Sequence, residues 1–216
     1  SGGCENDTSE SFTLYYNSSC HSNAYSLTYY YPEDTLLEGF WNFKQDTILI
    51  DETGNHCGAL TDTLSHFVSD RDFSLSSSLK VIGGAVFSNP LDSSKLDSAF
   101  TINFWFRSDS IKSSSFDFLN IYSHSGKFNS IELGKTSSDL RVSQSSTTAS
   151  FAYAGSQIPG TWSMMTIKYL NDTISLYLDA ALMSKTSFTL NVSNDMYLRI
   201  PSNSSTHRIM DEMTLW

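Results

Sequence analysis

Apolar and polar residues alternate along most of the chain. In FTINFWFRSDS (100–110), a large apolar residue occupies every second position: Phe100, Ile102, Phe104 and Phe106. Successive side chains of a β-strand point to opposite faces of a sheet, so this stretch predicts a strand with one face in a core. Trp105 falls on the other face, between Asn103 and Arg107. A face of that composition is either covered by another part of the protein or open to a ligand.

The same period-two pattern, rich in β-branched and aromatic residues, recurs along the chain. Segment 60–70 predicts one short helix or a further strand. Strands that follow one another without long helices indicate an all-β fold, an antiparallel sandwich or barrel. The predicted strands are 37–43, 83–88, 99–108, 116–123, 130–135, 140–145, 162–170, 173–180, 187–191, 195–200 and 209–216.

Tight turns join some of these strands. The pair Asn171-Asp172 separates two alternating runs, 162–170 and 173–179, and two turn-forming residues between such runs are typical of a hairpin. The next predicted turn is Asp179-Ala180, where Ala is a poor substitute for Gly. Serine-rich clusters between strands predict loops at 76–78, 113–115 and 145–148.

Residues 1–35 differ from the rest of the chain. They begin with a polar stretch and continue into AYSLTYYYPED, whose tyrosines favour an extended strand. This N-terminal extension is either an edge strand of the main domain or a segment that docks on a neighbouring molecule by strand addition. Both alternatives remain open from the sequence.

Length and charge narrow the class of protein. A chain of 216 residues with 39% hydrophobic content can bury the core of one β-sandwich. Its net charge of −10, with scattered basic residues, argues against nucleic acid as a partner. The chain has no apolar run of the length that spans a membrane. Because it begins at Ser1 without methionine, we expect a processed chain or a piece of a longer one.

Glycosylation signals and cysteines favour a secreted or cell-surface protein. If Cys4 and Cys20 pair, the closed loop of about 15 residues stabilises the fold by about 3 kcal/mol. Pairing of Cys20 with Cys57 is the rival, one thiol is left over in either case, and no spacing suits zinc. The N-glycan acceptor pattern Asn-x-Ser/Thr occurs at Asn6, Asn17, Asn171, Asn191 and Asn203.

Several motifs in order carry a family resemblance over residues 36–216. LEGFWNFKQDTILIDETGNHCGAL resembles the opening of laminin-G-like domains, and KVIGGAVFSNP, FTINFWFRSDS, TWSMMTIKYLNDTISLYLDAAL and IMDEMTLW resemble later strands of the same domains. Ala180 departs from the family's Gly, and residues 1–35 have no counterpart. In the opening motif the matching residues are Gly39, Trp41, Phe43, Asp51, Thr53, Gly54, Asn55, Gly58 and Leu60.

This resemblance is to the laminin-G-like, concanavalin A-like jelly-roll domains, and it implies two antiparallel sheets face to face with the first and last strands paired. It also implies a non-catalytic module for adhesion or for recognition of a glycan or an extracellular protein. On such a fold, Trp105, Asn103 and Arg107 form a candidate ligand-binding face, unless the protein itself covers Trp105.

Catalysis is not expected from these residues. A glycoside hydrolase needs two carboxylates on one sheet face. The sequence has no acidic residues two positions apart in a suitable strand, and the adjacent Asp211 and Glu212 point to opposite faces. The five histidines are scattered, and no nucleophile motif accompanies them.

Calcium is a candidate cofactor, since many laminin-G-like domains bind it. If the first and last strands are neighbours, Asp51 approaches Asp211 and Glu212, with Glu38 and Asn55 nearby, and supplies the oxygen ligands that Ca²⁺ prefers. The alternative is that Asp51 caps its own turn and Asp211 pairs with Arg208.

Two functions from different classes therefore follow. The first is the extracellular recognition module. The second is a structural subunit of a surface coat or filament, which self-assembles when residues 1–35 of one copy reach the next copy.

Overall fold

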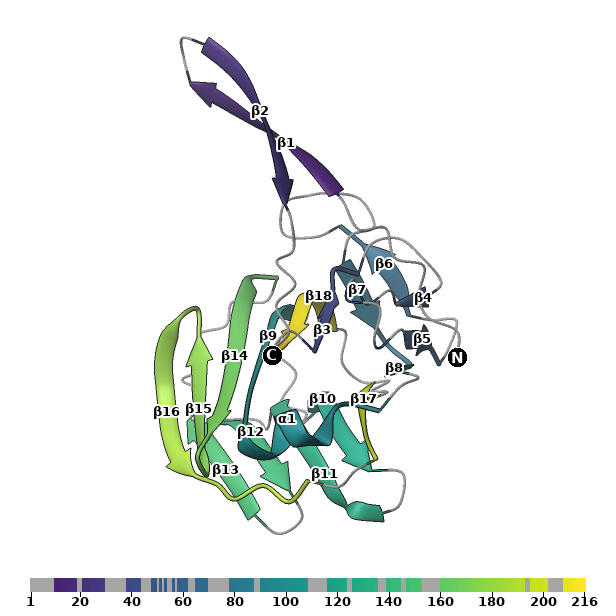
Figure 1. Ribbon diagram of the computed structural model, residues 1–216, viewed down its shortest axis with the longest axis vertical. Coiled ribbons are helices and arrows are strands. Elements are labelled where there is room, and N and C mark those ends of the chain that lie inside the picture. The colour runs from purple at the N-terminus through teal and green to yellow at the C-terminus, as the bar shows by residue number, and fades with distance from the viewer. Residues whose placement is uncertain are drawn as a thin grey trace.

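The computed structural model of the protein describes residues 10–18, 21–29, 38–43, 48–49, 51, 53, 56, 58–61, 65–69, 78–87, 90–108, 116–123, 126–135, 139–144, 147–152, 160–192, 195–201 and 208–216. It contains two eight-stranded sheets and one separate two-stranded sheet, and every strand pair is antiparallel (Figure 1). The predicted antiparallel β-sandwich is confirmed.

The first sheet is called the β9 sheet after its central strand. Within the described residues its end strand β16 hydrogen-bonds to one strand, β15, which makes it an edge of this sheet, and β13 of the other sheet lies close to it. The strand order is β16 (Ala181–Ser187), β15 (Thr173–Leu178), β14 (Trp162–Leu170), β9 (Ala99–Ser108), β18 (Arg208–Leu215), β7 (Ser78–Val81) and β6 (His66–Val68), with β3 (Gly39–Trp41) also pairing β18.

The second sheet is called the β10 sheet. The helix α1 (Ser93–Ser98) precedes β9, and the side chain of Asp92 caps it by accepting a hydrogen bond from the Ser94 amide at 3.0 Å. The strand order is β13 (Thr147–Ala152), β12 (Asp139–Gln144), β11 (Gly126–Lys135), β10 (Phe116–Ser123), β17 (Met196–Ile200), β8 (Ala85–Phe87), β5 (Gly58–Leu60) and β4 (Ile48–Leu49).

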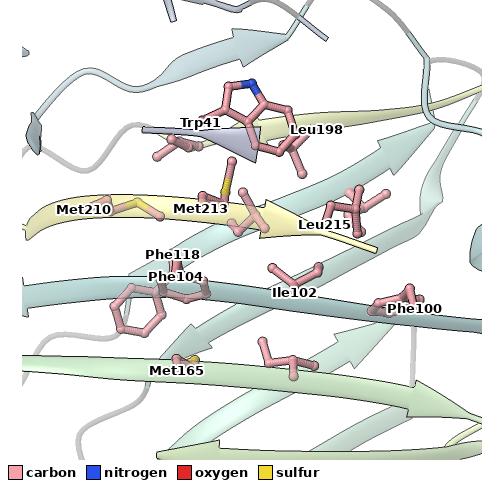
Figure 2. Packing of buried hydrophobic residues seen from close by; sticks show 14 of the residues in the cluster. Trp41, Phe100, Ile102, Phe104, Phe118, Met165, Leu198, Met210, Met213 and Leu215 are labelled. Carbon is pink, nitrogen blue, oxygen red and sulfur yellow. The ribbon is translucent and has the colours of Figure 1, made fainter. Parts of the chain in front are cut away.

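The core lies between the two sheets and is built from the alternation seen in the sequence. All four apolar residues of the 100–110 stretch are at most 2% exposed. From the opposite sheet, the Phe118 ring lies 5.7 Å from Phe104 and 4.9 Å from Phe106. Figure 2 shows Phe104 and Phe118 side by side, with Met213 close to Trp41. The strand between Phe100 and Phe106 therefore supplies the centre of the hydrophobic core.

The pairing of the first and last strands of the sandwich is also confirmed. Trp41 in β3 lies opposite Met213 in β18, and β18 runs beside β9. The predicted hairpin at Asn171-Asp172 joins β14 to β15, with both turn residues at positive φ (48° and 53°). The turn Asp179-Ala180 joins β15 to β16, and Ala180 has a φ of 66°.

Some element predictions were wrong. Segment 60–70 contains the short strand β6, so the strand alternative holds and the helix alternative does not. The strand predicted at 187–191 lies earlier in the chain: β16 ends at Ser187, and residues 188–191 are not in a strand. Two predicted loops begin strands, at Ser78 in β7 and at Thr147 in β13. Each of these strands is at or near a sheet edge, where partly polar sequences can pair.

The N-terminal strands form their own sheet. β1 (Glu10–Ser18) and β2 (His21–Tyr29) pair with each other over nine residues, and neither pairs with the two large sheets. Figure 1 shows this hairpin standing away from the sandwich. The expected edge strand of the main domain is therefore not formed by β1 or β2, and the division into residues 1–35 and 36–216 remains a prediction.

Candidate functional site

The predicted ligand-binding residues lie on the outer face of the β9 sheet. Trp105, Asn103 and Arg107 are all partly exposed. The Arg107 guanidinium carbon stands 5.2 Å from the centre of the Trp162 ring, and the Asn103 amide nitrogen donates to the Thr214 hydroxyl at 3.2 Å. This face is therefore partly exposed to solvent. Arg107 and Asn103 on it contact side chains of the neighbouring strands β14 and β18.

The same face continues across three more strands. Trp105 lies opposite Met164 in β14, and Asn103 lies in a cross-strand row that reaches Tyr177 in β15 and Leu182 in β16 through Thr166. We call the partly or fully exposed residues of this region the outer β9 face. They are Asn103, Trp105, Arg107, Trp162, Met164, Tyr177 and Leu182.

A second constellation lies on the outer face of the β10 sheet. The Arg199 guanidinium carbon is 5.1 Å from the centre of the Tyr122 ring, and the Tyr197 ring lies 6.1 Å from Tyr122. With the Asn120 amide oriented to satisfy both of its groups, its oxygen accepts from the Arg199 Nη2 at 3.1 Å and its nitrogen donates to the Leu119 carbonyl at 2.8 Å. Arg199 is therefore fixed by stacking and by a hydrogen bond.

Charged side chains extend this constellation. The Nη2 atom of Arg141 lies 3.3 Å from Asp117 Oδ1 and 4.0 Å from Glu132 Oε2, and the Ser143 hydroxyl donates to the same Glu132 oxygen at 3.3 Å. The strand register places Ser143, Glu132, Asn120 and Arg199 in one cross-strand row. We call this set the arginine–tyrosine face; it comprises Asp117, Asn120, Tyr122, Glu132, Arg141, Ser143, Tyr197 and Arg199.

Sequence reasoning missed the arginine–tyrosine face. Its residues come from β10, β11, β12 and β17, so no short motif contains them. The only local signal is that the polar Asn120 and the partly exposed Tyr122 alternate with the apolar core residues Leu119 and Ile121 along β10, although Asn120 is itself 4% exposed. That pattern marks an outward face, but it does not reveal which strand lies beside it.

Two carboxylates on this face flank the Arg141 guanidinium, and they come from neighbouring strands rather than from one. Asp117 belongs to β10 and Glu132 to β11. A glycoside hydrolase places the bond to be cleaved between its two carboxyl groups. Here a single guanidinium contacts both carboxylates instead, which makes the arrangement suited to holding Arg141 in place.

The calcium prediction meets a different arrangement at Asp51. This side chain is 1% exposed and accepts four hydrogen bonds. Its Oδ1 accepts from the amides of Phe40 at 2.8 Å and Thr53 at 3.0 Å, and its Oδ2 accepts from the Thr53 hydroxyl at 2.7 Å and the His56 amide at 2.8 Å. Asp51 therefore caps its own turn, as the alternative interpretation expected.

The other proposed metal ligands do not join Asp51. Asp211 is buried in β18 opposite Trp105, and Glu212 follows at a φ of 40° beside an irregularity in the strand. Among the residues that the structure describes, no group of three His, Cys, Asp or Glu side chains could hold a metal ion. Asp51, Asp211 and Glu212 are thus not brought together, and calcium binding remains an untested prediction.

Glu38, the further acidic residue considered for calcium, belongs to the same buried network as Asp51. Its Oε1 lies 3.1 Å from His56 Nε2 and accepts from the Asp92 amide at 2.9 Å. The Trp41 indole nitrogen donates to the His56 carbonyl at 3.0 Å. These contacts tie the first strand of the sandwich to the loop after β4 and to α1, so the network is structural.

The modification sites are only partly described. Asn171 and Asn191 are exposed, and Asn17 lies in β1. The remaining acceptor residues Asn6 and Asn203, the site candidate Asn55 and all three cysteines, Cys4, Cys20 and Cys57, lie outside the described residues.

Comparison with known protein families identifies the superfamily of the chain. Residues 83–216 match the model of the concanavalin A-like lectin/glucanases superfamily. The chain belongs to this superfamily. The match begins just before β8, so all residues of the outer β9 face and of the arginine–tyrosine face lie within the matched region. No curated protein matches the sequence. Within the described part of the chain, no helix is long and apolar enough to cross a membrane.

Solved structures similar to this chain include binding domains of botulinum neurotoxins. The serotype D/C binding domain is 14% identical, with a TM-score of 0.65, over 84% of this chain and 49% of that one. The DC binding domain in complex with rat synaptotagmin II is 15% identical, with a TM-score of 0.67, over 84% of this chain and 48% of that one. The DC domain in complex with SialylT is 14% identical, with a TM-score of 0.63, over 84% of this chain and 48% of that one. The chain thus spans about half of these domains, and at this identity the likeness shows the fold.

Proposed function

We propose that the protein is a non-catalytic, extracellular recognition module that binds a glycan on the arginine–tyrosine face. The observation that carries this proposal is the geometry of Arg199, which is stacked on Tyr122 and hydrogen-bonded to Asn120. A planar guanidinium fixed beside two aromatic rings offers directional donors and an apolar surface together.

That combination matches the chemistry of a sugar ring. A pyranose presents C–H groups on its flat side and hydroxyl groups around its rim. Tyr122 and Tyr197 supply aromatic surface for the flat side. Glu132 is partly exposed and supplies an acceptor on the same cross-strand row, where the buried Asn120 and Ser143 hold Arg199 and Glu132 in place. These side chains hold one another in position, so little conformational entropy is lost when a ligand binds.

The absence of catalysis in this proposal rests on Arg141. Its guanidinium contacts both Asp117 and Glu132 on this face. A hydrolase with that pair would need the space that the guanidinium occupies. We therefore expect the protein to bind glycans without cleaving them, which chromatography of an incubated oligosaccharide checks directly.

The extracellular location is supported by exposed glycan acceptors. Asn171 lies in a tight turn at positive φ, where an attached sugar points to water. Thr173→Ala destroys the acceptor pattern while leaving Asn171 in its left-handed conformation. Expressed in a secretory cell line, the unmodified protein should lose mass on peptide N-glycosidase treatment, and the T173A variant should carry one glycan fewer. A secreted chain with no N-glycans would contradict this part of the proposal.

A glycan array followed by calorimetry tests the binding face. Tyr122→Ala removes the ring under Arg199, and Arg199→Lys keeps the charge but loses the planar fork. Each should weaken the Kd for an array hit, by up to about tenfold for the ring given its typical contribution of about 0.5–1.5 kcal/mol. Tyr177→Ala, a partly exposed tyrosine on the other sheet, is the matched control and should bind normally. Equal affinity of all four proteins would refute the assignment of this face.

The second candidate function is a structural subunit that self-assembles through its N-terminal segment. The observation that favours it is the hairpin β1–β2, which pairs with neither sheet of the sandwich. The two functions are compatible, since the arginine–tyrosine face and the N-terminal segment are separate parts of the chain.

A further inference from the structure

We propose that the outer β9 face, at the edge strand β16, receives the N-terminal hairpin β1–β2 of a second copy of this chain. This rests on the second candidate function, self-assembly through the N-terminal segment, and deepens it by assigning the acceptor surface on the β9 sheet. Four observations carry it: the isolation of the hairpin, its residue pattern, the exposed apolar residues of β16 and the distribution of charge.

Among the strands that the structure describes, none outside the hairpin pairs with it. Its two strands pair only with each other over nine residues. A single two-stranded hairpin is marginally stable in water, and three or more strands or a packed surface are needed for stable folding. Strands of this length therefore call for a further strand or an apolar surface.

The register shows what kind of surface the hairpin fits. In the stretch where 11–14 pair with 25–28, apolar pairs alternate with polar pairs, whereas Tyr15 pairs with Ala24 and Tyr16 with Asn23 beyond it. Alternate positions of a strand share one face, so this stretch of the hairpin is amphipathic. The apolar pairs are Phe12 with Leu27 and Leu14 with Tyr25, and the polar pairs are Ser11 with Thr28 and Thr13 with Ser26.

The edge of the β9 sheet offers a matching surface. In β16, Leu182 is 55% exposed and Met183 is 39% exposed, and Leu182 lies opposite the partly exposed Tyr177. A seven-residue edge strand presents backbone amides and carbonyls that another strand can pair. Lys185 is the only charged residue in this strand, so its sequence does little to block such pairing.

Charge distinguishes the two partners. Residues 1–35 contain five acidic residues (Glu5, Asp7, Glu10, Glu33 and Asp34) and neither lysine nor arginine. The strands that carry the outer β9 face present the exposed Lys168 and Lys185 and the partly exposed Arg107. The exposed Asp172 and Asp179 lie in the turns at the ends of these strands, so the positive charge is carried by the strands themselves. In a chain of net charge −10, this local complementarity favours the N-terminal segment as the occupant.

The contact between copies is head to tail. The donor segment and the acceptor strand are different surfaces, so each copy can give its hairpin to one neighbour and receive a hairpin from another. Two copies that exchange hairpins reciprocally form a closed dimer, and a non-closing rotation gives an open fibre. Both products require the same acceptor strand.

Self-association of the full chain tests the proposal. Light scattering coupled to size exclusion, over a range of concentrations at physiological salt, should show a dimer or larger species. Leu182→Asp puts a charge in the acceptor strand and should shift the protein to monomer. Ala59→Asp is the control: Ala59 is exposed in β5 of the other large sheet, so its variant should associate normally. Glu10→Lys with Glu33→Lys should weaken association by at least tenfold in Kd.

Circular dichroism and a thermal melt show whether each variant is folded. If the unmodified chain were strictly monomeric, the proposal would be wrong. That result would include the case in which the hairpin docks on the sandwich of its own chain. So would unchanged association of the L182D variant, which would place the contact elsewhere. Glycan binding by the Y122A variant is measured independently of these results, so failure of one proposal does not decide the other.

Discussion

The buried carboxylate of Asp51 gives the sharpest test of how this fold is held together. Its two oxygens accept three backbone amides, from Phe40, Thr53 and His56, and one hydroxyl. Asp51→Ala leaves those three amides without their acceptor in a site where the parent side chain is 1% exposed. Asp51→Asn keeps one oxygen but turns an NH₂ group toward an amide donor.

The expected loss follows from the cost of unsatisfied buried donors. Each costs about 1–3 kcal/mol, so three amides with partial access of water give a loss of about 3–6 kcal/mol for D51A. For a chain of this length that lowers the melting temperature by roughly 10–20 °C. We expect D51N to lose about half as much, since one pair of hydrogen bonds survives.

Urea unfolding followed by tryptophan fluorescence measures the difference, because Trp41 packs beside this turn. Asp97→Ala, an exposed acidic residue of α1, is the matched control and should change stability by less than about 0.5 kcal/mol.

The same experiment with EDTA separates a structural role from a calcium site. If Asp51 acts only as a hydrogen-bond acceptor, chelation leaves the stability of both the unmodified protein and D51A unchanged. A loss of stability on chelation in the unmodified protein alone would show that Asp51 is a metal ligand. A D51A variant as stable as the parent would refute the hydrogen-bond reasoning itself.

Three further predictions concern single residues of the sandwich. Gly39→Ala should destabilise the fold by about 1–3 kcal/mol in urea unfolding, because a Cβ at this position would overlap the buried ring of Trp41; a neutral effect would mean that the ring can shift. Ala180→Gly should stabilise the fold by about 1 kcal/mol, because Ala180 has a φ of 66°; destabilisation would contradict the turn geometry. Burial raises the pKa of Tyr169, and the hydrogen bond and charge of Asp172 raise it further. Stability should therefore fall as the pH rises above about 10, because the tyrosine ionises first in the unfolded chain. In Asp172→Asn, ultraviolet titration should show a pKa of Tyr169 that is lower but still raised, since burial is the larger cause, and an unchanged titration would refute the role of Asp172.

The sequence was most informative where one face of a strand is buried. The alternation of Phe100 to Phe106 predicted β9 because each of these side chains enters the core. The pairing of β3 with β18 came from the family resemblance, since nothing local to Trp41 or Met213 indicates a contact between the two ends of the sandwich.

The parts that could not be predicted lack such a signal. All seven residues of β16 are exposed or partly exposed, and none faces the core, so ALMSKTS has no clear period. The helix α1 is six residues long, too short for a helical period to show. The arginine–tyrosine face depends on which strands are neighbours, and Arg199 is 77 positions from Tyr122 in the sequence.

The ion pairing of Arg141 has a consequence for how ligands arrive. On the arginine–tyrosine face the positive charges of Arg141 and Arg199 are matched by the negative charges of Asp117 and Glu132. Such a surface exerts almost no force beyond a Debye length, so encounter with a ligand is governed by plain diffusion. An uncharged oligosaccharide reaches it unhindered, whereas a polysulfated one is repelled by the surrounding −10 chain before any contact forms. Neutral sugars are thus favoured at the approach, ahead of any selection by shape.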